Sequence, residues 1–137
     1  HDIQIDIEEA LPHIWADRVR VVQILANLIS NANKYTPDQG QIIFSAEQSP
    51  NVWNPDGAPQ VVHIAVKDNG MGISEEDQRK IFQKFFRTES AKSSDAPGTG
   101  LGLNITKNLT EMQGGQIWFE SEVGKGTTFH VTFPIAV

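Results

Sequence analysis

The first candidate site residues along the chain are asparagines in the run NLISNANKYT, whose spacing could place their amide side chains together. A helix turns about 100° per residue, which places one polar stripe at Gln23, Asn27, Ser30, Asn31 and Lys34, away from the Val, Leu and Ile positions. Asparagine costs a helix roughly 0.5–0.7 kcal/mol relative to alanine, so Asn27 and Asn31 are poor choices for solubility alone. An amide oxygen is a neutral, hard ligand suited to Mg²⁺. The stripe is a candidate metal site, with a solvated helix face as the alternative.

A second candidate is DNGMG, from Asp68 to Gly72, which directly follows an apolar run. Its two glycines let a flat ligand approach the backbone closely. The Asp68 carboxylate can accept a hydrogen bond from the 6-amino group of adenine, whereas guanine presents an acceptor there. The alternative is a glycine-rich turn in which Asp68 only bonds its own backbone.

A third candidate is PGTGLGLNITKNL, from Pro97 to Leu109, in which Gly98, Gly100 and Gly102 lead into a predicted helix. Free backbone N–H groups and the positive end of a helix dipole suit a phosphate chain. The run lacks the Gly-Lys-Ser/Thr of a Walker loop, and no strand precedes it as in a dinucleotide-binding loop. A flexible loop with a glycine-relaxed helix start remains the alternative.

Two further motifs are weak when each is taken singly. The run GKGTTF, residues 124–129, is typical of a hairpin turn between strands. The run IFQKFFR, residues 81–87, with Phe82, Phe85 and Phe86, is more typical of a hydrophobic core than of a cofactor site.

The elements that must position these motifs follow from hydrophobic period and turn residues. Alternation predicts strands at 3–7, 41–47, 61–67, 116–121 and 127–133. The Pro-, Asn- and Gly-rich segment between the second and third of them predicts a surface hairpin loop. Composition rich in Ser, Ala, Gly and Thr predicts a mobile loop at 87–100.

Three helices are expected between these strands. The first is capped by Asp17, ends before Pro37, and has its apolar positions at Val21, Val22, Leu25, Leu28, Ile29 and Ala32. Ser74 precedes the acidic first turn of a short second helix. The third is marked by Leu101, Ile105, Leu109 and Met112 and stops at Gly114-Gly115. The order of elements predicts a two-layer α/β sandwich, with about three helices covering one face of a mixed sheet.

The 137 residues suit one domain, and 39% hydrophobic content suits a real core. Seventeen acidic and eleven basic residues give a formal charge of −6, which argues against nucleic-acid binding. Residues 1–17 hold five acids and no Lys or Arg, so the remaining 120 residues carry only −1. An anion site in the body of the domain is therefore compatible with the acidic total.

Cysteine is absent, which excludes disulfides, thiolate metal sites and cysteine nucleophiles and fits a reducing compartment. No apolar run approaches the roughly 18 residues of a membrane span, and no secretory signal opens the chain. We expect a cytoplasmic domain without direct membrane contact that forms part of a larger protein.

The order of the motifs is more specific than any one of them. An Asn-bearing helix, an Asp-x-Gly-x-Gly turn, an aromatic cluster, a Gly-x-Gly-x-Gly loop and a Gly-x-Gly-Thr hairpin occur in sequence along nearly the whole chain. With them the chain resembles the catalytic, ATP-binding domain of bacterial sensor histidine kinases, in the gyrase/chaperone/kinase/MutL superfamily. NLISNANKYTP resembles the family's N box, DNGMGIS its first glycine box, and IFQKFFR its F box. GTGLGL resembles the second glycine box and GKGTTF the terminal glycine motif. The resemblance implies a Bergerat-type fold.

For the metal and phosphates, the resemblance implies a catalytic set of Asn27, Asn31 and Lys34. Asn31 would be the side-chain ligand of Mg²⁺, with Asn27 beside it holding the metal or the phosphates. Lys34 would reach the phosphate chain, and Tyr35 would line the nucleotide pocket. Such roles fit phosphoryl transfer, which depends on positioning and charge neutralisation.

For the adenine, the resemblance implies that Asp68 reads the amino group while Gly70 and Gly72, followed by Ile73, give the base room. Thr127 would lie near the adenine through a water shared with Asp68.

Residues 87–100 would be the ATP lid, and Arg87 and Lys92 in it are candidate γ-phosphate contacts, with a solvated role as the alternative. The nucleotide contacts expected in and around the lid are Phe86, Arg87, Gly98, Thr99, Gly100, Leu101, Gly102 and Leu103.

Two departures from the family pattern refine the expectation. Hydrolysing members of the superfamily carry a Glu four residues before the metal Asn, and Asn27 occupies that position here. Because an amide cannot act as a general base, we expect weak intrinsic ATP hydrolysis. The family's phosphoacceptor motif is absent around His1, His13, His63 and His130, and the last two are expected to be structural. The chain should therefore need a separate dimerisation and phosphoacceptor domain N-terminal to it.

The sequence thus predicts a protein-histidine kinase catalytic domain that uses Mg²⁺ and ATP, with a response regulator receiver domain as a further partner. An ATP-driven clamp of the gyrase or MutL type, a nucleotide-binding relay module without kinase activity, and a serine kinase of the anti-sigma type are the alternatives.

Overall fold

Five strands form one sheet in the order β1-β2-β3-β5-β4. The computed structural model describes residues 2–7, 18–36, 40–50, 60–82 and 102–135. The strands are β1 (Asp2–Ile7), β2 (Gln41–Pro50), β3 (Gln60–Asp68), β4 (Gln116–Glu122) and β5 (Gly126–Pro134). β1 pairs parallel with β2, and the other neighbours are antiparallel. The expected mixed sheet is confirmed.

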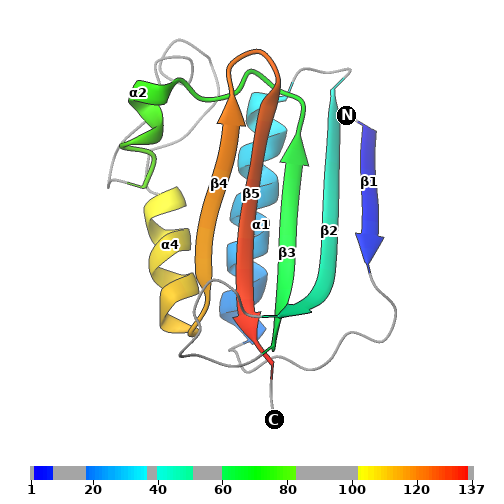
Figure 1. The fold of residues 1–137 in the computed structure, drawn as a ribbon, viewed down its shortest axis with the longest axis vertical. Helices are drawn as coiled ribbons and strands as arrows, with labels where there is room; N and C mark the ends of the chain where they lie inside the picture. Colours follow the sequence, from blue (N-terminus) through cyan, green and yellow to red (C-terminus); the bar gives the residue numbers. More distant parts are fainter. Residues whose placement is uncertain (1, 8–17, 37–39, 51–59, 83–101, 136–137) are drawn as a thin grey trace.

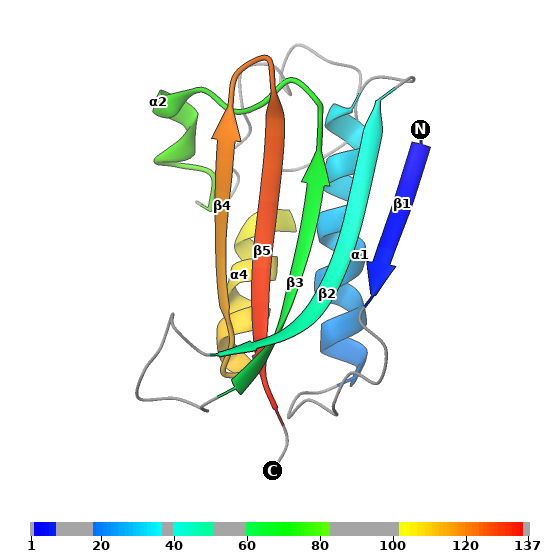
Figure 2. The same ribbon diagram turned by 45° about the vertical axis from the view of Figure 1, so that its right-hand side comes forward.

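Helices α1 (Arg18–Tyr35) and α4 (Gly102–Met112) cover one face of this sheet, as Figures 1 and 2 show. α1 connects the parallel strands β1 and β2, which need a crossover because a tight hairpin joins only antiparallel neighbours. The third helix, α2 (Glu75–Gln78), is a single turn capped by Ser74, whose hydroxyl accepts from the Asp77 N–H. The predicted two-layer α/β sandwich is therefore confirmed. Among the described residues, no helix is both long and apolar enough to cross a membrane.

The core lies between the helices and the sheet. From α1 it takes Ile24, Leu28 and Ala32, and from the sheet alternate residues of β2, β3 and β5. The sheet residues of this hydrophobic cluster are Ile42, Ala46, Val62, Ile64, Val66, Phe129, Val131 and Phe133. Because side chains alternate across a strand, the intervening residues of these strands lie on the opposite, outer face, which no described helix covers (Figure 1).

The apolar face of α1 differs from the expected one. Val22 is 60% exposed and Ile29 is 37% exposed, whereas Ile24 is fully buried. Val22 and Ile29, two of the apolar positions that marked this helix, therefore lie outside the core, because the helix packs against both the sheet and α4. Asn27 and Asn31 are consequently half-buried beside the buried residues of α1 rather than on the far side of the helix.

In α4 the helix is confirmed, but two of the apolar residues that marked it are not buried. Ile105 and Met112 are exposed, and the buried positions are Thr106, Leu109 and Thr110. Thr110 donates its hydroxyl to the carbonyl of Thr106, so these polar side chains are satisfied within the helix and can be buried.

Candidate functional site

Asp68 is the last residue of β3, and its side chain is buried at the end of the sheet. Its Oδ1 accepts hydrogen bonds from the backbone N–H of Gly70, at 2.9 Å, and of Thr127, at 3.3 Å. Burial raises the pKa of the Asp68 carboxyl, and these two hydrogen bonds oppose that rise. Since both bonds use Oδ1, Oδ2 can accept from a ligand. The arrangement suits recognition of an exocyclic amino group.

Two glycines allow the backbone around Asp68 to pack closely. Gly72 has φ +74°, and a Cβ there would overlap the carbonyl oxygen of Glu122. Gly126 has φ +124°, and a Cβ there would overlap the carbonyl oxygen of Asp68. Only glycine fits both the conformation and the space. The turn after β3 is thereby held directly against the β4–β5 turn.

Ser121 connects these two turns, and sequence reasoning missed it. Its hydroxyl accepts from the Ile73 N–H at 2.8 Å and donates to the Gly126 carbonyl at 3.1 Å. Thr127 Oγ1 lies 2.7 Å from the same hydroxyl. The available signal was register: a serine placed opposite Thr127 across the β4–β5 hairpin. Thr127 therefore joins Asp68 directly through its backbone N–H, whereas the expected shared water remains a prediction.

The second part of the site lies between α1 and α4. Asn27 Nδ2 donates to Thr106 Oγ1 at 3.2 Å, and Thr106 is fully buried. The bond fixes the Asn27 amide, leaving its carbonyl oxygen Oδ1 as the acceptor. Asn31 lies one turn further along the same face of α1 and is half-buried. Thr106 was not expected; its only sequence signal was a threonine at a spacing that suits the buried face of the helix.

The described start of the aromatic motif packs with the core: Ile81 is buried in it and Phe82 lies against it, whereas Phe85 and Phe86 lie outside the described residues. Phe82 packs edge-on against Phe119 and Phe129, with ring centroids 5.7 and 6.5 Å apart. Its carbonyl accepts from Asn104 Nδ2 at 3.1 Å, which ties the start of this motif to α4.

Several predicted site residues fall outside the described parts of the chain. Lys34 and Tyr35 are in the last turn of α1, but their side chains are not described. Gly102 is the first residue of α4, and Leu103 packs against the core. The lid at 87–100 is also outside the described residues, as are Phe86, Arg87, Gly98, Thr99, Gly100 and Leu101.

The C-terminal end of α1 leads from the second part of the site toward the first. In Figures 1 and 2 the C-terminal end of α1, the end of β3 and the β4–β5 turn lie at the same end, while α4 begins beside α1. Within the described ranges no three His, Cys, Asp or Glu side chains could hold a metal ion together. A metal here would therefore depend on amide oxygens and on oxygens of the ligand, a donor set suited to Mg²⁺ with a phosphate chain.

Comparison with known proteins agrees with this geometry. The model of the histidine kinase-, DNA gyrase B-, and HSP90-like ATPase family matches residues 16–137. The chain belongs to this family. Family membership identifies the nucleotide as ATP.

Within the family, the chain is similar to sensor histidine kinases. It is 38% identical to the sensor histidine kinase WalK of Bacillus subtilis (strain 168) over 122 residues, covering 89% of this chain and 19% of WalK. It is 37% identical to the adaptive-response sensory kinase SasA of Prochlorococcus marinus (strain MIT 9303), covering 98% of this chain and 34% of SasA. The chain thus spans about a fifth to a third of the length of these relatives.

Solved structures give the same result for the fold. Full-length ShkA in complex with AMPPNP superposes with a TM-score of 0.76 at 31% identity, covering 99% of this chain and 26% of ShkA. AMPPNP is an ATP analogue, so a domain of this architecture occurs in a protein bound to such a nucleotide.

Proposed function

We propose that this domain binds Mg²⁺-ATP and transfers the γ-phosphoryl group to a histidine on a separate dimerisation and phosphoacceptor domain. The observation that carries the proposal is the buried Asp68 carboxylate, held by Gly70 and Thr127 at the end of the fold where α1 also ends (Figure 1). Similarity to WalK and SasA along nearly the whole chain supports the kinase assignment.

In this proposal Asp68 selects adenine. Oδ2 accepts from the 6-amino group, and the glycine turn lets the base approach the backbone. Guanine would place an acceptor against the same carboxylate, so ATP is favoured over GTP. Gly70, Gly72 and Ile73 line this end of the nucleotide.

At the phosphate end, Asn31 is the proposed ligand of Mg²⁺ and Asn27 its neighbour. Mg²⁺ held there would help to neutralise the negative charge that develops on the phosphoryl group during transfer. The Asn27–Thr106 bond orients the Asn27 amide before nucleotide binds. We place Lys34 on the phosphate chain and the segment from Phe86 to Leu103 around it; these roles rest on the family resemblance.

The transfer itself breaks the bond between the γ-phosphorus and the oxygen that bridges it to the β-phosphate, releasing ADP. A P–N bond forms to a neutral imidazole nitrogen of the acceptor, and the imidazole proton leaves from the other nitrogen. The domain supplies positioning and charge neutralisation. Because Asn27 cannot activate water as a base, the phosphoryl group is kept for the acceptor histidine. A receiver domain of a response regulator would take it next, in the cytoplasm.

The test mixes the domain with γ-³²P-ATP, Mg²⁺ and a separately made phosphoacceptor domain from the same parent protein. The proposal expects acid-labile, alkali-stable label on the acceptor histidine. Asn31→Ala should abolish it, whereas Val22→Ala, at an exposed position of α1 outside the polar stripe, should not. ATP binding without phosphohistidine on that acceptor would exclude the kinase assignment and favour a clamp or relay module.

A further inference from the structure

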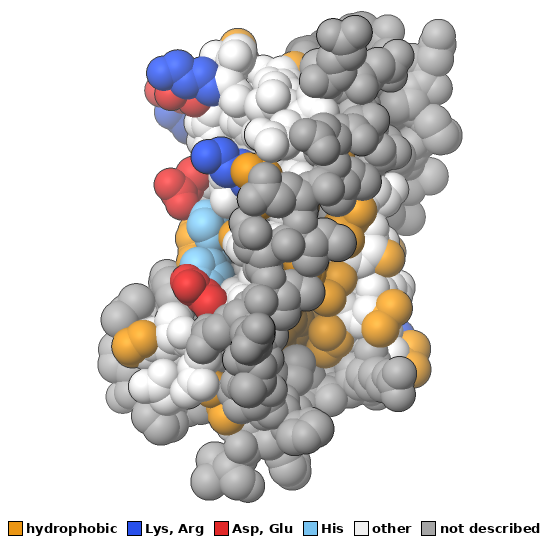
Figure 3. Space-filling view, turned by 90° about the vertical axis from the view of Figure 1, so that its right-hand side faces the viewer, with side chains coloured by type: hydrophobic (Ala, Val, Ile, Leu, Met, Phe, Trp, Pro, Cys, Tyr) orange, Lys and Arg blue, Asp and Glu red, His pale blue; other side chains and the backbone are white. Residues whose placement is uncertain are grey.

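The outer face of the sheet carries a pair of histidines that the nucleotide site does not use. His63 on β3 and His130 on β5 lie on the face opposite the helices, with His63 Nε2 2.8 Å from His130 Nδ1. Their side chains are 16% and 14% exposed. Figure 3 shows the histidine side chains at the surface between acidic side chains.

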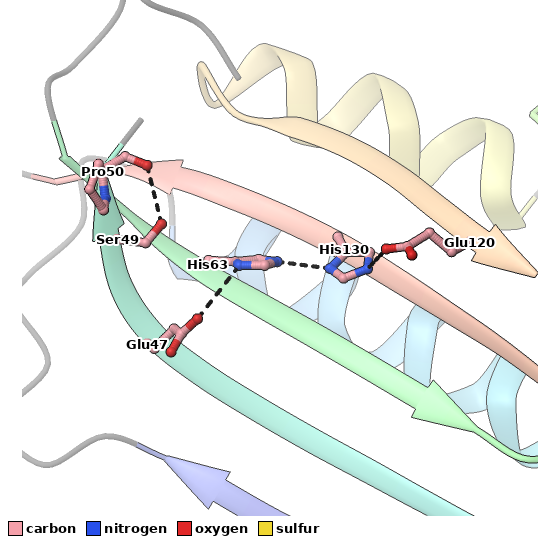
Figure 4. A network of polar contacts seen from close by, with 6 residues as sticks. All are labelled: Glu47, Ser49, Pro50, His63, Glu120 and His130. Atoms are coloured by element: carbon pink, nitrogen blue, oxygen red, sulfur yellow. Dashed lines mark hydrogen bonds and ion pairs between the residues drawn. The ribbon is translucent and has the colours of Figure 1, made fainter. Parts of the chain in front are cut away.

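The pair is bracketed by one carboxylate at each end. Glu47 on β2 places Oε1 3.9 Å from His63 Nδ1, and Glu120 on β4 places Oε1 2.9 Å from His130 Nε2. The row Glu47, His63, His130, Glu120 therefore crosses four strands, as Figure 4 shows. Trp118 of β4 stacks on His130, with ring centroids 4.9 Å apart and planes 3° apart. It also stacks on His63 at 5.4 Å.

The contacts determine where the hydrogens of the neutral pair reside. His130 Nε2 is buried next to the Glu120 carboxylate, in ion-pair contact but outside hydrogen-bond geometry. A lone pair there would be repelled, so Nε2 carries the hydrogen. His130 Nδ1 is then an acceptor, and His63 Nε2–H must donate to it. This leaves His63 Nδ1 as the basic nitrogen of the pair, facing Glu47.

A first added proton fits this chain of contacts, and a second does not. Protonation of His63 Nδ1 keeps the bond between the rings and places the new charge toward Glu47. A second proton must go to His130 Nδ1, where it would point at His63 Nε2–H. Two facing donors 2.8 Å apart cannot coexist, so the rings would have to separate.

We propose that the His63–His130 pair is a single-proton latch on the outer face of the sheet, which holds β3 to β5 while at most one proton is added and opens when a second binds. The same two strands carry Asp68 and Thr127, which pair in register at the ATP end. Opening of the latch therefore loosens the two strands whose ends form the proposed adenine site.

The electrostatics favour a closed latch at neutral pH. Burial lowers the pKa of His63, the nearby His130 lowers it further, and Glu47 raises it. Burial also lowers the pKa of His130, and Glu120 raises it. Among the described residues on this face, Lys67 lies four positions along β3 and Glu122 two positions beyond Glu120. Glu122 contacts Lys125.

The direction of the pH effect follows from the lowered pKa values. The unfolded chain takes up protons at its ordinary value of about 6.5, above the folded values. Stability from the pair is therefore complete above about pH 6.5 and is lost as the pH falls through the folded pKa values.

The test is an NMR titration of the imidazole Cε1–H resonances in the whole domain, from pH 8 down to the pH at which the domain unfolds. Strongly coupled sites titrate as a pair, so His63 and His130 should both report two shared steps, the second proton binding at least about tenfold more weakly. In His63→Gln the remaining His130 should titrate in one step. Independent single steps in the parent, unchanged for His130 in His63→Gln, would overturn the latch.

Matched variants separate the latch from general surface charge. Glu47→Gln should weaken binding of the first proton, and Glu120→Gln should alter both steps, whereas Glu122→Gln should leave them unchanged. A second readout needs no histidine variant. The fluorescence of Trp118, obtained as the difference between the parent and Trp118→Phe, should change with pH in the same two protonation steps. A difference that stays constant through the histidine titration would also refute the proposal.

Discussion

Replacing Asp68 by asparagine separates recognition of adenine from maintenance of the fold. Gly70 and Thr127 both donate to Oδ1, so the variant must place its carbonyl oxygen there. Its NH₂ group then occupies the position of Oδ2 and meets the adenine amino group donor to donor. A hydrogen bond to a charged acceptor contributes about 1.5–3 kcal/mol, so ATP affinity should fall roughly 10- to 150-fold.

The same substitution should leave the fold intact. Burial raises the pKa of the Asp68 carboxyl, so the folded state resists its ionisation. The contribution of this carboxyl to stability is complete below its unfolded pKa, near 3.9, and is lost as the pH rises through the raised folded value. Compared with the parent, Asp68→Asn should therefore become relatively more stable as the pH rises from acid to neutral.

The assay is calorimetric titration with Mg²⁺-ATP and Mg²⁺-GTP, with thermal melts of both proteins at several pH values. The parent should prefer ATP, and the variant should lose most of that preference because its NH₂ can donate to the guanine 6-oxo group. A folded variant with unchanged ATP affinity, or a parent that binds both nucleotides equally, would refute the role of Asp68.

Three further predictions test other parts of the site. Gly126→Ala should destabilise the domain by at least about 3 kcal/mol, because left-handed strain of about 1–2 kcal/mol adds to overlap with the Asp68 carbonyl. The control Gly124→Ala, at φ +83° with open space around it, should cost only the strain. Equal losses of stability for the two variants in denaturant unfolding would contradict this prediction. Thr106→Val should lower stability by about 1 kcal/mol and weaken ATP binding, since Asn27 loses its partner; unchanged affinity by calorimetry would show that this bond does not orient Asn27. The isolated domain should release phosphate from ATP very slowly, and sustained rapid turnover in a phosphate-release assay would show that a base other than residue 27 activates water.

The fold was largely predictable because its elements obey simple periods. Alternation in 61–67 and 127–133 identified the central strands, and Ser74 identified the start of α2. The buried faces of the helices were less predictable. α1 packs against both the sheet and α4, so its buried stripe passes through Ile24 and brings half-buried Asn27 and Asn31 beside it, while Val22 is exposed. A helix with two neighbours does not follow a one-sided apolar pattern.

The site was predictable where the type of a residue and its immediate neighbours in the sequence indicate its role. Gly70 and Gly72 indicated close approach to the backbone, and Asp68 before the turn indicated an acceptor, whereas Gly126 indicated only a hairpin turn. Ser121 and Thr106 were missed because their roles depend on partners far along the chain: Ser121 bonds Ile73, and Thr106 bonds Asn27. Neither pairing has a local sequence signal. His63 and His130 were expected singly to be structural, and their contact with each other depends on the cross-strand register.

One titration tests the central claim that the ends of β3 and β5 and the facing sides of α1 and α4 form a single ATP site. Mg²⁺-ATP is added to ¹⁵N-labelled domain while amide resonances are followed by NMR. The backbone signals of Gly70 and Thr127 and the side-chain amides of Asn27 and Asn31 should shift together with one dissociation constant, and removal of Mg²⁺ should reduce the shifts at the asparagines most. Shifts confined to other residues, or two unrelated dissociation constants for the two groups, would contradict the account.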